Sequence, residues 1–427
     1  FREGSFMKVK IKPSTCSGSI TIPPSKSMAH RAIICASLTN GHSVISNVDY
    51  SQDILATIQG MRKLGALIKQ DGHTLHIDGI CDFQHIKDTH IHCKESGSTL
   101  RFFIPIFSLC NQPITFSGEG RLMQRPQKVY EEIFQKQGLP FLQNNDEICI
   151  SSSLKPDNFV LKGDISSQFI SGLLFTLPLL KEDSTIQILP PFESRSYVQL
   201  TLQMLEAFGI HAYFKEENLI YIPGNQTYKP CNYTVEGDFS QFAFFAVLAS
   251  IQNDLYIKGV NPSSRQGDKQ ILTILKDFGI QVEEKKEGYL VRKGIPKGSY
   301  IDLGNCPDLG PILCVLGMYA QKETHIAHAK RLRMKESDRI LAMEEELHKF
   351  HVDIRSGEDD IYIKGNQTYV CEKELYGHND HRIVMALCIA GLCANKEIII
   401  DGAQAINKSY PSFFEDIISI QGKVEYI

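Results

Sequence analysis

The chain repeats itself six times in steps of about 71 residues, and this period constrains the fold more than any single motif. In each repeat an amphipathic helix is followed by a residue suited to end it, usually glycine, which adopts a left-handed backbone without strain. These residues are Gly65, Gly138, Gly209, Gly279, His351 and Gly422. A fixed period over the whole length indicates that the chain is built from one supersecondary unit.

A second marker has the same period: a short polar segment, here called a head, that opens a strongly apolar helix. The heads begin at Ser27, Ser98, Ser167, Ser240, Asp308 and Asp380. Helices that are apolar on all sides are expected to be buried, whereas the helix before each glycine carries charge on one side. In the first repeat, Ser27 is the predicted cap of a helix over 28–38. A strand at 43–46, a helix over 53–64 and strands at 66–69 and 74–77 follow.

The repeat therefore reads βαβαββ, and it predicts an α/β fold of two similar domains. Each domain would hold three repeats, with the buried helices inside a ring of sheets, an inside-out α/β barrel. We expect one domain over 25–235 and a second over 236–427 that includes 1–24. The strand 8–12 precedes the first repeat and is expected to complete the second domain. Two crossover strands would then join the halves and allow closure by induced fit.

Composition narrows the class of protein. A net charge of -4 and a pI near 6.4 argue against a nucleic-acid binder or a membrane-surface protein. Twelve cysteines without a C-x-x-C pair favour a reduced, cytoplasmic compartment over a disulfide or zinc framework. The longest apolar run, 169–180, is too short and too interrupted to cross a bilayer. Residues 1–6 are expected to be a cloning remnant ahead of a natural start at Met7.

Cationic side chains gather at the heads and in the loops that follow them. They are Lys26, Arg31, Arg101, Arg125, Arg195, Lys335, Arg339, Arg382 and Lys408. Helix N-termini also favour anions, so a cleft faced by these heads would suit a small, highly anionic substrate. The alternative for any one of these residues is an ordinary solvated surface charge, and for 331–339 an exposed helix with ion pairs.

Other chemistries lose their usual sequence support. The chain contains no G-x-x-x-x-G-K-[ST], no G-x-S-x-G and no H-E-x-x-H, the motifs of nucleotide cleavage, serine hydrolysis and zinc proteolysis. His381 has no second histidine at ligand spacing, so a capping or packing role is favoured over metal binding.

Seven short motifs occur in a fixed order, each at a head or in an adjoining loop. They are Pro-Ser-Lys-Ser-x-x-x-Arg over 24–31, Arg125-Pro126, Ser-Ser-Gln over 166–168, Pro307-Asp308, Lys-Glu-Ser-Asp-Arg over 335–339, Asn-Asp-His-Arg over 379–382 and Lys-Ser-Tyr-Pro over 408–411. From Met7 to the last residue the chain resembles the enolpyruvyl transferase family, in particular the members that act on shikimate 3-phosphate.

The resemblance implies transfer of the enolpyruvyl group of phosphoenolpyruvate to the 5-hydroxyl of shikimate 3-phosphate, with release of phosphate. It assigns shikimate 3-phosphate to Lys26, Ser27, Arg31, Ser166, Ser167, Gln168, Ser194, Tyr197, Asp308 and Lys335. It assigns phosphoenolpyruvate to Lys26, Gly97, Arg125, Gln168, Arg339, Arg382 and Lys408. No metal or organic cofactor is expected, since phosphate is already a leaving group, and the expected partners are these two small molecules acting on a monomer.

The reaction needs a proton for the methylene carbon of phosphoenolpyruvate and a base near the attacking hydroxyl. Glu336 is the candidate acid and Asp308 the candidate group that positions or deprotonates the hydroxyl, and Lys26 could assist either transfer. Glu336 stands among cations, which favour its ionised form, so a neighbour or closure must promote its protonation.

Alternatives from other classes remain open at this point. The sister enzyme that acts on UDP-N-acetylglucosamine usually carries Lys-Asn at the first head and a cysteine where this chain has Gly120. A non-catalytic protein that binds phosphorylated metabolites would have no use for the carboxylates Asp308 and Glu336. A repeat scaffold for proteins would present an exposed apolar face. The second head, 95–101, departs from the usual family pattern and predicts reduced sensitivity to the inhibitor glyphosate, which occupies the phosphoenolpyruvate site.

Overall fold

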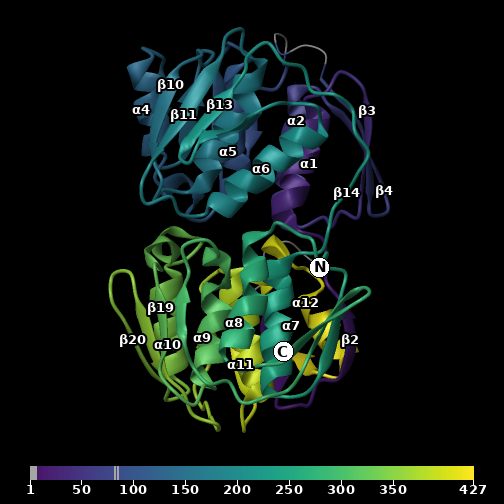
Figure 1. Ribbon diagram of the computed structural model, residues 1–427, viewed down its shortest axis with the longest axis vertical. Coiled ribbons are helices and arrows are strands. Elements are labelled where there is room, and N and C mark those ends of the chain that lie inside the picture. Colours follow the sequence, from purple (N-terminus) through teal and green to yellow (C-terminus); the bar gives the residue numbers. More distant parts are fainter. Residues whose placement is uncertain (1–6, 81–82, 84–85) are drawn as a thin grey trace. The chain divides into compact units, whose positions relative to one another are not determined.

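The structure is a computed structural model that describes residues 7–80, 83 and 86–427. Residues 1–6 and Cys81 lie outside the described residues. The chain forms two compact units, each with its own hydrophobic core. The N-terminal unit lies within residues 24–235, and the C-terminal unit is formed by residues 7–23 and 236–427 (Figure 1).

Three helices in each unit are buried along almost their whole length, because they are apolar on every side. In the N-terminal unit these are α1 (Lys26–Ser37), α3 (Gly97–Ser108) and α5 (Ser167–Thr176). In the C-terminal unit they are α7 (Phe239–Ile251), α9 (Gly310–Met318) and α11 (His381–Cys393), which pack on one another.

The remaining α-helices are amphipathic and cover the buried ones. They are α2 (Gln52–Leu64), α4 (Lys128–Lys136), α6 (Arg195–Ala207), α8 (Ile271–Asp277), α10 (Arg339–His348) and α12 (Phe413–Ser419). Short 3-10 helices are η1 (Leu122–Gln124), η2 (Leu177–Leu179), η3 (Gly267–Gln270), η4 (Pro307–Leu309), η5 (Lys330–Met334) and η6 (Ala403–Lys408).

Each unit has three four-stranded sheets with one common topology. In each sheet one edge strand pairs in parallel with its neighbour and the other pairings are antiparallel, as the βαβαββ pattern requires. In the C-terminal unit, β19 and β20 lie on one side of the buried helices and β2 on the other (Figure 1).

The strands of the N-terminal unit form the orders β14-β3-β5-β4, β6-β7-β9-β8 and β10-β11-β13-β12. Their bounds are β3 (His42–Ser46), β4 (Leu67–Asp71), β5 (Thr74–Asp78), β6 (His90–His92), β7 (Ile114–Ser117), β8 (Phe141–Gln143), β9 (Glu147–Ile150), β10 (Asn158–Lys162), β11 (Ser184–Leu189), β12 (Tyr213–Glu216), β13 (Leu219–Ile222) and β14 (Tyr233–Thr234).

The strands of the C-terminal unit form the orders β16-β17-β15-β2, β18-β19-β21-β20 and β22-β23-β1-β24. Their bounds are β1 (Lys8–Lys12), β2 (Gly18–Thr21), β15 (Leu255–Lys258), β16 (Val282–Lys285), β17 (Gly288–Val291), β18 (Tyr300–Asp302), β19 (Thr324–Ala327), β20 (Asp353–Ser356), β21 (Ile361–Lys364), β22 (Leu375–Tyr376), β23 (Ile398–Asp401) and β24 (Lys423–Tyr426).

Three strands complete sheets formed by distant parts of the chain. β1 lies between β23 and β24, as expected for the strand left over before the first repeat. β2 and β14, which the sequence did not predict, pair in parallel with β15 and β3. Each unit is therefore closed by segments from both ends of its own stretch of chain.

The helix ends differ from the sequence predictions in two places. Gly65, Gly138, Gly209, Gly279 and His351 adopt positive φ, but in the sixth repeat the left-handed residue is Gln421 rather than Gly422. In the first repeat Ser25, not Ser27, caps α1, because Ser25 accepts a hydrogen bond from the Met28 amide at 3.3 Å. None of the helices in the described part of the chain is long and apolar enough to cross a membrane.

Candidate active site

The heads of the buried helices in the N-terminal unit are capped by serines. Ser96 accepts a hydrogen bond from the Thr99 amide at 3.2 Å, and Ser166 accepts one from the Gln168 amide at 3.4 Å. With Ser25 on α1, all three helices begin with a hydroxyl that satisfies one terminal N–H. Free N–H groups remain at each helix start, and they carry the partial positive charge that favours anions.

Arg31 is a buried cation held by neutral oxygens. Its Nε donates to Thr201 Oγ1 at 2.8 Å and its Nη1 to the Ser27 carbonyl at 2.7 Å, while Nη2 reaches the Tyr197 carbonyl at 3.3 Å. Burial lowers the pKa of Arg31 to about 10, so the guanidinium stays charged at neutral pH. An anion at this place would gain an interaction that the neutral oxygens do not supply.

A second group of contacts links the heads of α3 and α5. Arg101 Nη1 donates to Gln168 Oε1 at 2.9 Å, and Gln168 Nε2 donates to Ser98 Oγ at 2.8 Å. The Arg101 guanidinium lies over the Phe169 ring at 4.6 Å. Arg101 thereby fixes which side of the Gln168 amide carries the donor.

Gly97 opens α3 beside the guanidinium of Arg125. A Cβ atom at Gly97 would lie 2.7 Å from Arg125 Nη1, which is inside van der Waals contact. Arg125 is 9% exposed, and its Nε has no hydrogen-bond acceptor among the residues that the structure describes. Such buried, unsatisfied donors are rare unless a ligand supplies the acceptor.

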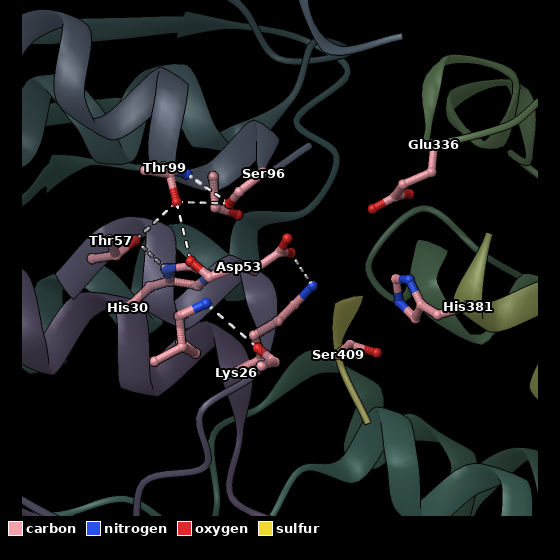
Figure 2. A network of polar contacts seen from close by, with 12 residues as sticks. Lys26, His30, Asp53, Thr57, Ser96, Thr99, Glu336, His381 and Ser409 are labelled. Atoms are coloured by element: carbon pink, nitrogen blue, oxygen red, sulfur yellow. Dashed lines mark hydrogen bonds and ion pairs between the residues drawn. The ribbon is translucent and has the colours of Figure 1, made fainter. Parts of the chain in front are cut away.

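Lys26 lies at the start of α1 and forms an ion pair with Asp53 in the first turn of α2, with 2.7 Å between Nζ and Oδ2 (Figure 2). The predicted Ser167 and Tyr197 lie on α5 and α6 of the same unit, and Ser194 directly precedes α6. Ser194 is fully buried and has a φ of 52°, a left-handed conformation that the surrounding structure must impose.

In the C-terminal unit, Arg339 is the centre of an ion-pair cluster. It begins α10 and is 1% exposed. Its Nε lies 2.8 Å from Asp380 Oδ2, its Nη2 lies 2.7 Å from Glu336 Oε2, and its Nη1 lies 3.2 Å from Asp308 Oδ1. One guanidinium thus contacts both candidate catalytic carboxylates and the cap of α11, since Asp380 also accepts from the Arg382 amide at 3.0 Å.

Asp308 and Lys335 form the second pair of this cluster, 3.2 Å apart. Burial alone would raise the pKa of Asp308, but the charges of Lys335, Arg382 and Arg339 hold that pKa well below its usual range. Burial lowers the pKa of Lys335 to about 8, although Asp308 opposes this change. Asp308 is consequently ionised at neutral pH, whereas Lys335 is within reach of its neutral form.

Arg382 and Lys408 complete the predicted cations of this unit. Arg382 Nη2 donates to Ser240 Oγ on α7 at 3.0 Å and lies 3.5 Å from Asp308 Oδ2. Its Nη1 is buried and has no acceptor within the described residues. Lys408 Nζ donates to the Asn379 carbonyl at 2.6 Å, which ties the end of η6 to the head of α11.

Two features of the sequence prove to be structural. Arg195, one of the nine predicted cations, stacks between Phe192 and Phe214, with 5.3 and 4.4 Å to the ring centroids. His381 is 1% exposed within α11, and Asp380 rather than His381 caps that helix.

Among the described residues, one group has metal-ligand geometry: Glu345, Glu346 and His378. The Glu346 carboxylate already contacts Lys349 Nζ at 2.7 Å, the Tyr376 amide at 3.0 Å and His378 Nε2 at 2.8 Å. These contacts satisfy the carboxylate without an ion.

Sequence reasoning missed Asp53 and Asp380 as partners of the predicted cations. The sequence pattern places Asp53 only at the start of the second helix and Asp380 only at the start of a head. Both pairings join residues 27 or 41 positions apart, so no local pattern reveals them. The repeat contains one signal for these pairs: both aspartates lie at helix starts, as do the cations that they contact.

Comparisons with known proteins agree with this geometry. The family model described as EPSP synthase (3-phosphoshikimate 1-carboxyvinyltransferase) matches residues 11–417. A 3-phosphoshikimate 1-carboxyvinyltransferase of Clostridium perfringens is 46% identical over 418 residues, which cover 97% of this chain and 98% of that protein. The enzyme of the same name from Clostridium kluyveri is 41% identical over 424 residues, 98% of each chain.

Solved structures give the same result for the fold. An EPSP synthase from Acinetobacter baumannii superposes with a TM-score of 0.81 at 25% identity and covers 99% of this chain and 100% of its own. An enolpyruvyl transferase from Streptomyces tendae has a TM-score of 0.80 at 14% identity, covering 99% of each chain, and supports the fold alone. The predicted fold class is confirmed, and the chain belongs to the EPSP synthase family of 3-phosphoshikimate 1-carboxyvinyltransferases.

Proposed function

We propose that this protein transfers the enolpyruvyl group of phosphoenolpyruvate to the 5-hydroxyl of shikimate 3-phosphate and releases phosphate. One observation carries the assignment of the site: buried cations lie at or beside capped helix starts. Two of them, Arg125 beside the start of α3 and Arg382 at the start of α11, have a donor without an acceptor in the described structure. Two phosphates and two carboxylates in the substrates would supply such acceptors. The family match and the curated relatives do not favour the sister reaction on UDP-N-acetylglucosamine.

Both units contribute residues to each ligand in this proposal, and each unit is an enolpyruvyl transferase domain of three repeats. Shikimate 3-phosphate is held by Lys26, Ser27, Arg31, Ser166, Ser167, Gln168, Ser194, Tyr197, Asp308 and Lys335. Phosphoenolpyruvate is held by Lys26, Gly97, Arg125, Gln168, Arg339, Arg382 and Lys408.

Glu336 is the proposed acid that protonates the methylene carbon. Its carboxylate is bound by Arg339 at 2.7 Å, an interaction that favours the ionised form. An anionic substrate that takes over the Arg339 guanidinium withdraws this partner, and Glu336 then accepts a proton more readily. Competition between Glu336 and the substrate for Arg339 is thus the proposed means by which protonation of Glu336 is promoted.

Asp308 is proposed to position the attacking hydroxyl rather than to carry its proton away at first contact. Three cations stabilise its ionised form, which makes it a strong acceptor and a weak base. Substrate anions that engage Lys335 and Arg382, one from each substrate, would reduce this stabilisation and raise the basicity of Asp308. Lys26, held by Asp53, is proposed to assist proton transfer.

The remaining expectations concern the protein as a whole. We propose a monomer, because each unit buries a complete core of its own. The eleven cysteines within the described residues are free, which supports a reducing, cytoplasmic compartment. The proposed reaction uses no metal and no organic cofactor.

Phosphate release from phosphoenolpyruvate, measured with and without shikimate 3-phosphate, tests the function. Release is expected only with both substrates. Glu336→Gln should lower kcat at least 100-fold, in the range typical for loss of a general acid. Glu345→Gln, on the exposed side of α10, is the matched control and should leave kcat unchanged. Release without shikimate 3-phosphate, or equal activity of both variants, would overturn the assignment.

A further inference from the structure

Four polar side chains form a hydrogen-bonded chain inside the apolar core of the N-terminal unit (Figure 2). His30 Nδ1 lies 2.8 Å from Thr57 Oγ1, which lies 2.8 Å from Thr99 Oγ1, which lies 2.7 Å from Ser96 Oγ. His30, Thr57 and Thr99 have no exposed surface and Ser96 is 1% exposed. None of them belongs to the predicted set of substrate ligands.

These residues lie at the helix starts, each within about one turn of Lys26, Asp53 or Gly97. His30 lies one helical turn after Lys26 on α1, and Thr57 lies one turn after Asp53 on α2. Thr99 follows Gly97 in the first turn of α3, and its hydroxyl is also 3.5 Å from the Asp53 carbonyl. The chain thus joins three helices one layer beneath the Lys26–Asp53 ion pair.

The hydrogen atoms in this chain have a preferred order. His30 Nε2 has no hydrogen-bond partner among the described residues, and a buried N–H without an acceptor costs more than a bare ring nitrogen. The proton therefore resides on Nδ1, which donates to Thr57; Thr57 then donates to Thr99, and Thr99 to Ser96. Burial, with the charges of Lys26 and Arg31, lowers the pKa of His30 well below its usual value, so the ring is neutral.

Ser96 is the end of the chain that reaches the substrate side. The same oxygen that accepts from Thr99 Oγ1 also accepts from the Thr99 amide and caps α3. Gly97 is the next residue, and it lies against the Arg125 guanidinium. A shift of Ser96 would consequently move Gly97, the residue against which the Arg125 guanidinium packs.

We infer that His30, Thr57, Thr99 and Ser96 are positioning residues that hold Gly97 and the start of α3 in register with Lys26. Buried polar chains of this kind define position more than they add stability, because apolar side chains of similar size would also fill the core. This inference rests on the proposed roles of Lys26, Gly97 and Arg125 toward phosphoenolpyruvate.

The test uses Thr57→Val and Thr99→Val, which remove a hydroxyl at nearly constant volume. Each is expected to raise the KM for phosphoenolpyruvate roughly tenfold, the effect of one buried hydrogen bond, with kcat and the KM for shikimate 3-phosphate nearly unchanged. The double variant should be no worse than either single variant, since both break the same chain. Thr99→Ser keeps the hydroxyl and should restore the wild-type KM.

Thr176→Val is the control, because Thr176 is a fully buried threonine at the far end of α5. It should lower stability to a similar degree without any change in KM. Nitrogen-15 NMR of His30 gives an independent readout: the wild-type ring should be the Nδ1–H tautomer, and Thr57→Val should change its Nδ1 signal. An unchanged KM in both threonine variants, or an Nε2–H tautomer in the wild type, would overturn the inference.

Lys26→Met separates this inference from the proposed function. If Lys26→Met abolishes turnover while Thr99→Val leaves the KM for phosphoenolpyruvate unchanged, the positioning role is wrong and the site assignment stands. If Lys26→Met leaves turnover intact, the site assignment itself is wrong.

Discussion

The guanidinium of Arg339 and the carboxylate of Asp380 form a two-point contact, with 2.8 Å from Nε to Oδ2 and 3.2 Å from Nη2 to Oδ1. Arg339 is 1% exposed and Asp380 is fully buried. The same contact joins the first residue of α10 to the cap of α11, so it fixes the two heads that supply Arg339 and Arg382. The cations of this unit are therefore oriented by carboxylates before any substrate binds.

Asp380→Asn is expected to lower the free energy of unfolding by about 3 kcal/mol, although asparagine can still cap α11. The loss arises because Arg339 keeps its charge in a buried place without the carboxylate that makes the two-point contact. Urea unfolding of the variant measures the change. Glu358→Gln, which breaks the exposed pair with Lys330, is the control and should cost far less, because solvent screens an exposed ion pair. Equal losses in the two variants would show that the buried pair contributes no more to stability than the exposed one.

Binding of shikimate 3-phosphate should weaken as the pH rises through about 8, because Lys335 loses its proton there. Its pKa is lowered in the folded protein, so the charged, phosphate-binding form is complete only below that pH. The phosphate of the substrate is already doubly ionised in this range. Isothermal titration calorimetry from about pH 7 to about pH 9, a range that covers both sides of this pKa, measures the effect.

Lys335→Arg is the control for this pH dependence, since arginine stays charged throughout. Its affinity should be flat where the wild type falls. Asp308→Asn should move the wild-type midpoint to lower pH, because Asp308 raises the pKa of Lys335. The same fall in the arginine variant would assign the titration to another group.

Much of the fold could be predicted because the six repeats carry the same pattern of buried helices and helix-ending residues. The repeat pattern does not predict strands that are very short or that pair with distant parts of the chain. β2 and β14 have four and two residues and pair with strands about 190 or more positions away, so neither shows a period of its own. Ser25 and Ser27 are equally good caps in isolation, and only the backbone decides between them.

The motifs predict the types and positions of the candidate site residues but not the partners of these residues. Buried arginines at the heads follow from the motifs, whereas the contact of Arg339 with Asp380 depends on the packing of α10 against α11. Arg195 has the right charge and the right place in the repeat, yet Phe192 and Phe214 determine its orientation.

Gly97→Ala should raise the KM for phosphoenolpyruvate about tenfold or more and weaken glyphosate inhibition further. The added methyl group would approach Arg125 Nη1 to 2.7 Å, and the guanidinium, as the end of a flexible side chain, would move to relieve the clash. Steady-state kinetics with both substrates measures the effect, and shikimate 3-phosphate should keep its KM. Gly357→Ala, where no atom lies within 4 Å of the new methyl group, serves as the control. An unchanged KM in Gly97→Ala would separate Gly97 from the phosphoenolpyruvate site.

Fosfomycin should leave the activity intact, because Gly120 stands where the sister family carries the cysteine that this inhibitor alkylates. Gly120 has a φ of 58°, and a Cβ at this position would lie 2.5 Å from Glu95 Oε2. Gly120→Cys should therefore cost about 1–2 kcal/mol of stability.

The thiols near the heads are no substitute: burial raises the pKa of Cys306 well above its usual value, with Asp268, Asp302 and Asp308 adding to the effect. Such a thiol stays protonated and is a poor nucleophile. Incubation of the wild-type enzyme with fosfomycin, followed by the phosphate-release assay over time, checks the prediction. Progressive inactivation that phosphoenolpyruvate protects against would contradict it and point to a reactive cysteine in the site.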